Sequence, residues 1–568
     1  MPQKYELKRC MAPTEIQRRI IEQEGNLVVM ASPGSGKTYV ISEKMKAILR
    51  KEDFYDYQGV IAISYTRKAS SHLKERTLEG GLSSKNSFFG TIDSFCLTQV
   101  ILAFGNYVIG YPEKEVTPVD EKDLPADKKD NFAWITKIHP DYNDVDNDKW
   151  KILFDFFKEG YVLIQSLELM ALYVFRCSQA CRNYLKARFR YVFIDEYQDA
   201  DTYTDELLRE LVALGLKGVV VGDKNQSIFG FAHKDSKYLQ HLSENEDFVT
   251  YELSNNFRCA PSIINYSNRL LNARCELIDA DTKGMNYVLV EGGEESVADF
   301  LSQYIPSLCS RKKVASLNKV AILVKNSRTQ HLIDVALTIP HRLVETTVLD
   351  QELNPLSRLY AELLQFYFDP AKKLMSIIDE YIDYDSLRIS DMKELVSLKN
   401  TIRAIKENDD IIKMLPSLFK KVGKIMLPNQ NEGLSEEKLK EVLADEKMIA
   451  TYKPVSDNEV ALMTLHKSKG LEFDYVFHLN LNEWELPAKA PKDGDFNNSS
   501  FLSYEQDLDL HYVGITRARI GCCLVGSTIR TTSRGTTTKA TASEFLQING
   551  LRELRSDFSY SDGQFKRQ

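Results

Sequence analysis

The chain has 568 residues, which is too long for one ordinary core and predicts two to four domains. Its 43% hydrophobic and 27% charged residues are typical of a soluble globular protein, and no apolar run predicts a membrane span. The start of the chain lacks the apolar core of a secretory signal, and nine scattered cysteines argue against a disulfide framework, so we expect a cytoplasmic location. The net charge of −8 does not favour a nucleic-acid ligand, and charge alone predicts a small-molecule substrate.

The first motif joins a predicted strand, 27–30, to a predicted helix that begins near Val40. It reads Ala31-Ser32-Pro33-Gly34-Ser35-Gly36-Lys37-Thr38, with Ala at the position where this phosphate-binding pattern usually has Gly. The glycines allow backbone N–H groups to converge on phosphates, and the helix N-terminus adds a favourable field. Lys37 can reach the β- and γ-phosphates, and the Thr38 hydroxyl can help to hold Mg²⁺. The sequence therefore predicts a nucleoside triphosphate site here.

Polar and aromatic residues flank the next predicted elements. Gln17 lies on a predicted helix that Thr14 caps, and its amide could read an adenine edge, although such a side chain is usually only solvated. A predicted strand over 59–65 ends at Tyr65-Thr66, and a second strand end precedes Asp93. Aromatic and hydroxyl groups at strand ends can contact a sugar-phosphate backbone and stack on bases. Each stretch alone would equally suit a core.

Two acidic and amide motifs follow further apolar strands. The strand 191–194 runs into Asp195-Glu196, where Asp can hold Mg²⁺ through water and Glu can polarise an attacking water. The strand 218–222 leads to Gln226, which could sense a γ-phosphate, and to Phe231, which could stack on a base. A turn and a core aromatic explain the last two residues equally well. Strands that alternate with helices predict a parallel sheet.

The second half repeats this pattern with strands predicted at 320–324, 460–465, 475–479 and 521–526. Residues 350–450 have helical periodicity and form a predicted insertion. Arg258 and Arg517 each present a planar fork of donors that suits a γ-phosphate, although either residue alone would be more typical of a surface or salt-bridge arginine.

In this order, the motifs resemble those of the UvrD/Rep/PcrA group of superfamily 1A helicases. The resemblance is carried by the P-loop, Ile-Asp-Glu-Tyr-Gln-Asp, Gly-Asp-Lys-Asn-Gln-Ser-Ile-Phe-Gly, Asn-Phe-Arg, Thr-Leu-His-Lys-Ser-Lys-Gly-Leu-Glu-Phe and Tyr-Val-Gly-Ile-Thr-Arg-Ala. It implies an α/β fold of two RecA-like domains with parallel sheets, ATP between them, and a mainly helical insertion in each. The implied division is 1–99 with 184–252 as domain 1A, 100–183 as insertion 1B, 253–349 with 451–530 as domain 2A, 350–450 as a short insertion 2B, and 531–568 as a tail. We expect that tail to be a linker and a terminal helix.

The resemblance also implies roles for individual residues. The implied ATP contacts are Gln17, Ala31, Ser32, Pro33, Gly34, Ser35, Gly36, Lys37, Thr38, Phe257, Arg258, Glu472 and Arg517. The implied catalytic residues are Lys37, Asp195, Glu196, Gln226, Arg258 and Arg517, and the implied Mg²⁺ ligands are Thr38 and Asp195. Tyr65, Thr66, Asp93, Phe231 and His466 fall at positions implicated in DNA contact. Asp93 departs from the family pattern, which commonly has His there, and Ala232 replaces the usual Arg.

The implied activity is ATP-dependent movement 3′ to 5′ along single-stranded DNA or tailed duplex DNA. A closer likeness is to the UvrD-like helicase subunit of the Gabija antiphage system, which implies an OLD-type ATPase–TOPRIM nuclease as partner. The alternative is a DNA- or nucleotide-sensing ATPase subunit that regulates such a nuclease and unwinds little. No acidic nuclease cluster follows the last motif, so a fused nuclease is not expected.

Overall fold

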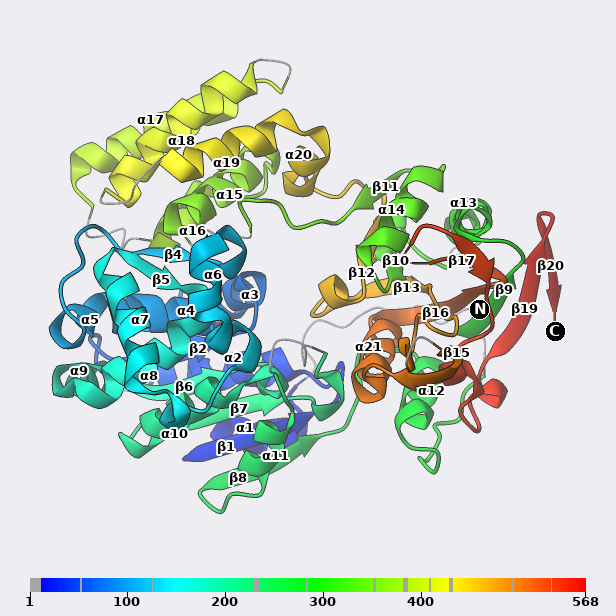
Figure 1. Cartoon of the computed structure of the whole chain (residues 1–568), viewed down its shortest axis with the longest axis horizontal. Helices are drawn as coiled ribbons and strands as arrows, with labels where there is room; N and C mark the ends of the chain where they lie inside the picture. The colour runs from blue at the N-terminus through cyan, green and yellow to red at the C-terminus, as the bar shows by residue number, and fades with distance from the viewer. Residues whose placement is uncertain are drawn as a thin grey trace. The chain divides into compact units, whose positions relative to one another are not determined.

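The structure is a computed structural model that describes residues 12–51, 54–124, 126–228, 234–281, 284–311, 313–350, 354–381, 387–407, 410–428, 433–492, 495–532 and 534–567. The chain divides into two compact units, Met1–Cys259 and Ala260–Gln568. Each unit contains its own central sheet (Figure 1). Among the described residues, no helix combines the length and the apolar character needed to cross a bilayer.

The central sheet of the first unit contains six described strands in the order β3-β2-β6-β7-β1-β8, and every pairing in it is parallel. The strands are β1 (Asn26–Ala31), β2 (Gly59–Ile63), β3 (Phe88–Gly90), β6 (Phe189–Ile194), β7 (Lys217–Gly222) and β8 (Phe248–Leu253). The four inner strands, β2, β6, β7 and β1, are mainly apolar because helices cover both faces of a parallel sheet. Helix α1 (Glu15–Glu22) precedes β1, and the described crossover helices are α2 (Lys37–Leu49), α3 (Arg67–Thr77), α10 (Thr202–Ala213) and α11 (Lys237–Ser243).

A mainly helical segment separates β3 from β6. Its described helices include α4 (Ile92–Phe95), α5 (Leu102–Val108), α6 (Ala126–Ala133), α7 (Asn147–Lys158), α8 (Leu167–Cys177) and α9 (Gln179–Arg188). The short strands β4 (Thr117–Val119) and β5 (Tyr161–Leu163) pair with each other. Helix α8 is buried over most of its length, because its residues are apolar on nearly every side.

The central sheet of the second unit contains eight described strands in the order β11-β12-β10-β13-β16-β9-β19-β20, parallel except for the last pair. The strands are β9 (Met285–Val290), β10 (Val320–Val324), β11 (His341–Leu343), β12 (Val460–Thr464), β13 (Phe473–His478), β16 (Ala518–Ser527), β19 (Ser556–Ser561) and β20 (Gln564–Arg567). Helix α12 (Pro261–Leu271) precedes β9, and α13 (Glu294–Ser310), α14 (Ser327–Ala336) and α21 (Tyr504–Thr516) lie between later strands of the sheet. The predicted α/β class with two RecA-like domains is confirmed.

A second helical group lies between β11 and β12 (Figure 1). Its helices are α15 (Pro355–Phe368), α16 (Leu374–Tyr381), α17 (Ile389–Ala404), α18 (Ile411–Met426), α19 (Gly433–Ala444) and α20 (Glu446–Tyr452). These helices have a hydrophobic core of their own, in which Leu359, Leu363 and Phe419 are fully buried. The group is therefore a separately packed layer within the second unit.

The expected tail over 531–568 is wrong. The chain continues through a short hairpin of β17 (Ile529–Thr531) and β18 (Thr537–Lys539), and β19 then pairs in parallel with β9. Aromatic residues alternate with polar ones along β19, and Tyr560 is buried against Phe300. This period of two is the pattern of a half-buried strand, which the polar composition of the segment conceals.

The expected domain boundary at 252/253 is also wrong. The Ser32 N–H donates to the Leu253 carbonyl at 2.9 Å, and the Phe257 N–H donates to the Gly34 carbonyl at 2.9 Å. These hydrogen bonds hold residues 253–259 against the P-loop, so Phe257 and Arg258 belong to the first unit.

Arg555 fastens the C-terminal strands to the second unit. Its guanidinium pairs with Asp557 at 2.8 Å and donates to the Tyr266 hydroxyl at 3.2 Å and the Leu546 carbonyl at 2.8 Å. We predict that Arg555→Ala lowers the free energy of unfolding of this unit by about 3 kcal/mol, because it leaves the Asp557 charge without its buried partner. Urea unfolding measures the effect, with Arg567→Ala on the exposed strand β20 as control. Equal stability of the two variants would contradict this role.

Candidate functional site

The P-loop connects the end of β1 to the start of α2. Gly34 and Gly36 have φ angles of 69° and 88°, in the left-handed region that favours glycine. A Cβ atom on Gly34 would lie 2.5 Å from Asn256 Oδ1 and 2.6 Å from Arg258 Cβ. Position 34 therefore requires glycine for two reasons: the φ angle is positive, and Asn256 and Arg258 leave no room for a Cβ atom.

Asn256 and Arg258 belong to the segment after β8. Asn256 Oδ1 accepts from the N–H groups of Arg258 at 2.8 Å and Cys259 at 2.9 Å, which folds the segment over the loop. The Phe257 side chain is 51% exposed although its backbone is bonded to Gly34. An exposed aromatic ring anchored beside a phosphate-binding loop suits stacking on a planar base.

Gln17 contacts the P-loop directly. Its Oε1 accepts from the Thr14 N–H at 3.0 Å in a capping box, and its Nε2 donates to the Ser35 carbonyl at 3.2 Å. The residue is 5% exposed, and its amide retains capacity for one further donated and one further accepted hydrogen bond. Gln17 therefore orients the loop, a function that the sequence interpretation as an adenine reader did not include.

Lys44 holds the helix that carries Gln17. Its ammonium, which comes from α2, donates to the Ile20 carbonyl at 3.0 Å and to the Gln23 carbonyl at the end of α1. Burial lowers the pKa of Lys44 to about 8. This buried cation at a helix C-terminus fastens α1 to the helix that follows the P-loop.

The carboxylates Asp195 and Glu196 lie directly after β6. Asp195 Oδ1 accepts from the Glu196 N–H at 2.9 Å, and the Asp195 N–H donates to the Ile63 carbonyl of β2 at 2.9 Å. Glu196 has a φ of 56°, which costs a non-glycine residue on the order of 1–3 kcal/mol. Lys37 Nζ lies 3.6 Å from Glu196 Oε1. The P-loop lysine and the Asp-Glu pair thus meet at one edge of the sheet.

A buried network connects these carboxylates to Gln226. The amide of Gln198 donates to Glu196 and accepts from the Asp223 N–H at 3.0 Å. Gln226 Nε2 donates to Asp223 Oδ2 at 2.9 Å. Burial raises the pKa of Asp223, and the nearby Lys37 charge opposes that shift. Sequence reasoning missed Gln198; the only available signal was its position in the Asp-Glu-Tyr-Gln-Asp motif.

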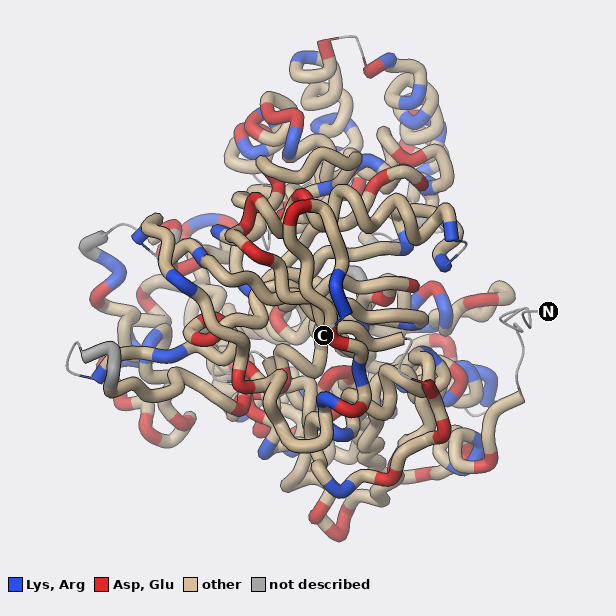
Figure 2. Tube along the Cα trace, turned by 90° about the vertical axis from the view of Figure 1, so that its right-hand side faces the viewer, with Lys and Arg blue, Asp and Glu red and all other residues tan. Residues whose placement is uncertain are grey.

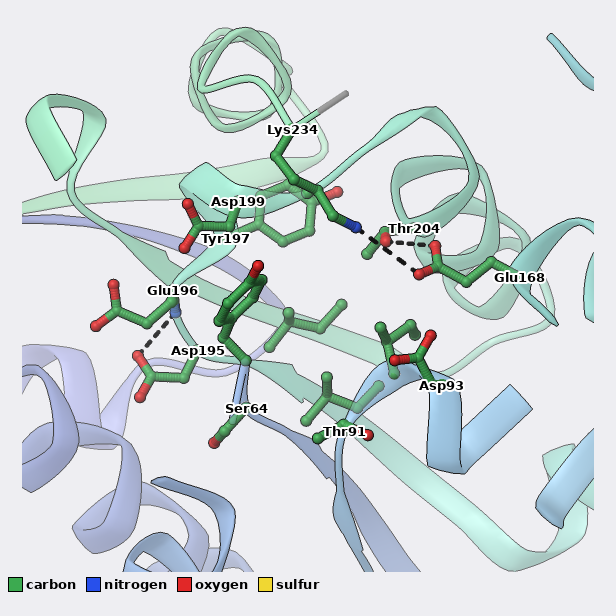
Figure 3. A pocket seen from close by; sticks show the side chains of 15 residues that line it. Ser64, Thr91, Asp93, Glu168, Asp195, Glu196, Tyr197, Asp199, Thr204 and Lys234 are labelled. Carbon is green, nitrogen blue, oxygen red and sulfur yellow. Dashed lines mark hydrogen bonds and ion pairs between the residues drawn. The ribbon is translucent and has the colours of Figure 1, made fainter. Parts of the chain in front are cut away.

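A pocket of about 250 Å³ opens beside the same carboxylates (Figure 3). Its walls include Ser64 and Tyr65 after β2, Thr91 and Asp93 around α4, and Lys234. The structure therefore brings two of the predicted DNA-contact residues, Tyr65 and Asp93, to the pocket that Asp195 and Glu196 also line. Sequence reasoning missed Lys234 and Glu168, which also line it.

The other predicted DNA contacts have different positions. Thr66 caps α3 by accepting from the Ala69 N–H at 3.2 Å, and it is exposed. Phe231 lies outside the described residues. His466 begins a short turn after β12 in the second unit.

Within the second unit, Arg517 and Glu472 are neighbours. Arg517 is 2% exposed at the end of α21, and its guanidinium donates to the carbonyls of Val513 at 3.2 Å and Leu471 at 3.2 Å. The Phe473 N–H donates to the Arg517 carbonyl at 2.9 Å. Arg517 therefore fixes the backbone on both sides of Glu472.

Thr38 and Asp195 provide a hydroxyl and a carboxylate, the hard oxygen donors that Mg²⁺ prefers. Both follow the C-terminal ends of strands in one parallel sheet, where such donors gather. The residues present therefore fit a magnesium ion bound together with a triphosphate.

Comparison with known proteins agrees with this geometry. Residues 15–232 match the family model of an AAA domain, and residues 359–524 match that of a UvrD-like helicase C-terminal domain. The chain is 26% identical to Gabija protein GajB of Bacillus cereus (strain VD045) over 532 residues, which cover 89% of this chain and 93% of that protein.

It is also 23% identical to ATP-dependent DNA helicase PcrA of Staphylococcus aureus (strain Mu50) over 616 residues, which cover 89% of this chain and 82% of PcrA. PcrA of Staphylococcus epidermidis is similar at 23% identity. Two sheets of RecA type, a P-loop facing an Asp-Glu pair and these matches in both halves lead to one conclusion: the chain is an ATP-dependent helicase that is similar to UvrD-like helicases.

Proposed function

We propose that this helicase hydrolyses ATP to move 3′ to 5′ along single-stranded DNA. The observation that carries the hydrolysis step is the 3.6 Å approach of Lys37 Nζ to Glu196 Oε1, and the direction of movement rests on the resemblance to the UvrD/Rep/PcrA group. A phosphate that Lys37 holds would lie next to the carboxylate that orients the attacking water. The printed name of PcrA, an ATP-dependent DNA helicase, supports the choice of DNA as substrate.

Each residue of the nucleotide site then has a specific role. Backbone N–H groups of the P-loop, those of Gly34 and Gly36 among them, and the Lys37 ammonium bind the phosphates, and Glu196 accepts a proton from water. Thr38 and Asp195 would hold Mg²⁺, which neutralises phosphate charge when bound. Gln226 senses the γ-phosphate, and its bond to Asp223 passes that signal towards Gln198.

The remaining ATP contacts come from three groups of side chains. Phe257 stacks on the base and Gln17 contacts its edge, while Glu472 contacts the ribose. Arg258 and Arg517 bind the γ-phosphate through their planar donor forks. The Arg258 backbone and the Arg517 guanidinium are already held by the hydrogen bonds described above, which reduces the conformational entropy that these two residues lose on binding.

DNA contact requires local groups, because the chain carries a net charge of −8. Figure 2 shows Lys and Arg interspersed with Asp and Glu along the trace rather than gathered in one block. We assign the contact to Tyr65, Thr66, Asp93, Phe231 and His466. Stacking on aromatic side chains contributes about 1–3 kcal/mol per base and does not depend on net charge.

The biological setting that we propose is an antiphage defence complex with an OLD-type ATPase–TOPRIM nuclease. The match to Gabija protein GajB over 93% of its length supports this setting. The same match supports the second candidate, a DNA- or nucleotide-sensing ATPase that regulates the nuclease and unwinds little.

We expect Lys37→Ala to reduce kcat for ATP hydrolysis by about 100-fold or more, because the charge that stabilises the developing phosphate charge is lost. Steady-state phosphate release in the presence of single-stranded DNA measures the change. The control is Lys51→Ala, which removes an exposed lysine of the same unit whose pairing with Glu24 is also exposed. Normal hydrolysis by Lys37→Ala would refute the assignment of this site.

Glu196→Gln separates binding from chemistry. The amide keeps the size of the side chain but accepts no proton, so kcat should fall about 100-fold while the Kd for ATP changes little. Rapid-quench hydrolysis and equilibrium titration with a fluorescent ATP analogue measure the two quantities. Glu22→Gln, at an exposed position on α1, is the matched control. A parallel loss of ATP binding would show that Glu196 instead stabilises the structure of the P-loop.

Polarity and unwinding are tested with duplexes that carry a 3′ tail, a 5′ tail or no tail. A 3′-to-5′ helicase separates only the 3′-tailed strands in the presence of ATP and Mg²⁺. Hydrolysis without strand separation, accompanied by activation of an added OLD-type nuclease, would support the sensing ATPase and reject the motor. Equal separation of 5′-tailed duplexes would contradict the proposed direction.

A further inference from the structure

The strongest unassigned feature is a buried cluster of charges formed by Lys234, Asp201 and Glu168, here called the Lys234 node. Lys234 Nζ lies 2.9 Å from Asp201 Oδ2 and 3.9 Å from Glu168 Oε1. The three side chains are 14%, 6% and 9% exposed. Thr204 donates to Glu168 through its hydroxyl at 2.7 Å and to Asp201 through its N–H at 2.8 Å.

The node joins three segments that are distant in the sequence. Figure 3 shows Lys234 pointing toward Glu168, with Thr204 beside them. Lys234 lies in the connection between β7 and α11, which also carries Gln226. Asp201 caps α10 and ends the segment that begins with Asp195 and Glu196. Glu168 lies in the first turn of α8, within the helical segment between β3 and β6.

Electrostatics show that the three side chains depend on one another. Burial raises the pKa of Glu168, and the neighbouring Asp201 charge raises it further. Burial alone would raise the pKa of Asp201, but Lys234 and hydrogen bonds from Glu168 and Thr204 outweigh burial and hold that pKa below its ordinary value. His139 Nε2 also lies 3.6 Å from Asp201. A buried cation with these partners costs far more to break than a surface ion pair.

A second contact reinforces the node. The Asp235 N–H, next to Lys234, donates to the Ala200 carbonyl, next to Asp201, at 3.1 Å. At the other end of the same connection, Ser227 Oγ donates to the Gln198 carbonyl at 3.1 Å. The connection that carries Gln226 is thus fastened to the segment that carries Glu196 at both of its ends.

We propose that Lys234 is a positioning residue that holds the Gln226 connection against the Asp195–Glu196 segment and against α8, and so couples ATP hydrolysis to the helical segment. The coupling rests on the proposed function, because it assumes hydrolysis at Glu196. Lys234 pairs with Glu168 of α8 and with Asp201, which caps α10. Movement of one of these helices therefore displaces the other. This role assigns a function to a residue outside the motifs that identified the site.

The test compares Lys234→Met, Lys234→Arg and Lys237→Met in DNA-stimulated ATP hydrolysis. Methionine keeps the length of the side chain without its charge, and we expect kcat to fall about tenfold with the KM for ATP within about twofold, as for a misplaced catalytic group. Arginine retains the charge and should keep at least about half of the wild-type kcat. Lys237, three residues further on, is about half exposed and should tolerate methionine.

Hydrogen exchange provides the readout for coupling to α8. In Lys234→Met the backbone amides at the start of α8 should exchange faster, while those of α2 stay at wild-type rates. If Lys234→Met does not fold, Glu168→Gln decides, because it keeps the Lys234–Asp201 pair and should lower kcat by a smaller factor with the same exchange pattern.

Two results would overturn the role of Lys234. The first is a Lys234→Met protein that matches Lys237→Met in kcat and in exchange. The second is a kcat loss that arginine does not restore. An inactive wild-type protein would instead contradict the proposed function, so the two failures are distinguishable.

Discussion

The parallel pairing of β6, β7 and β1 is the constraint on which the site depends. Because parallel strands end at the same edge of a sheet, the residues after β1 and those after β6 face the same space. That register places Lys37 3.6 Å from Glu196 although the two lie far apart in the sequence. A slip of one residue would turn the side chains of a strand to the opposite face of the sheet. The buried apolar faces of these strands therefore also fix the positions of Lys37 and Glu196.

Buried polar groups then connect the parts of the site. Gln198 is fully buried and bonds Glu196 on one side and the Asp223 backbone on the other. Gln226 reaches the same Asp223, and Lys234 fastens the far end of the connection that carries Gln226. In a low-dielectric interior, each such group is costly to leave unpaired, so the network favours a single arrangement. Under the proposed function, Asp223 and Gln198 would connect Gln226 to the segment that ends at Asp201.

Local sequence patterns predicted the central strands and the loops after them, because these features depend on residues that are adjacent in the chain. Apolar runs of strand length followed by Gly-Lys-Thr or by Asp-Glu identified the central strands and the loops that follow them, and the predicted class of two RecA-like domains is confirmed. The C-terminal segment was mispredicted because Phe558 and Tyr560 are embedded among polar residues, and a strand added to an existing sheet edge needs little apolar surface of its own. The boundary error at 252/253 had a related cause, since backbone hydrogen bonds to the P-loop leave no trace in side-chain pattern.

By itself, the sequence determined the order of the strands along the chain, the phosphate-binding loop and the acidic pair, because each depends on residues adjacent in the chain. Only the tertiary structure decided that Gln17 braces the loop through Ser35, that Gln198 joins Glu196 to Asp223, and that Lys234 pairs with Asp201 and Glu168. These contacts join residues from separate elements, and a lone Gln, Lys or Glu has no local signature of its partner. Burial turns such ordinary side chains into functional ones, because each buried donor or charge must find a matching group across the fold.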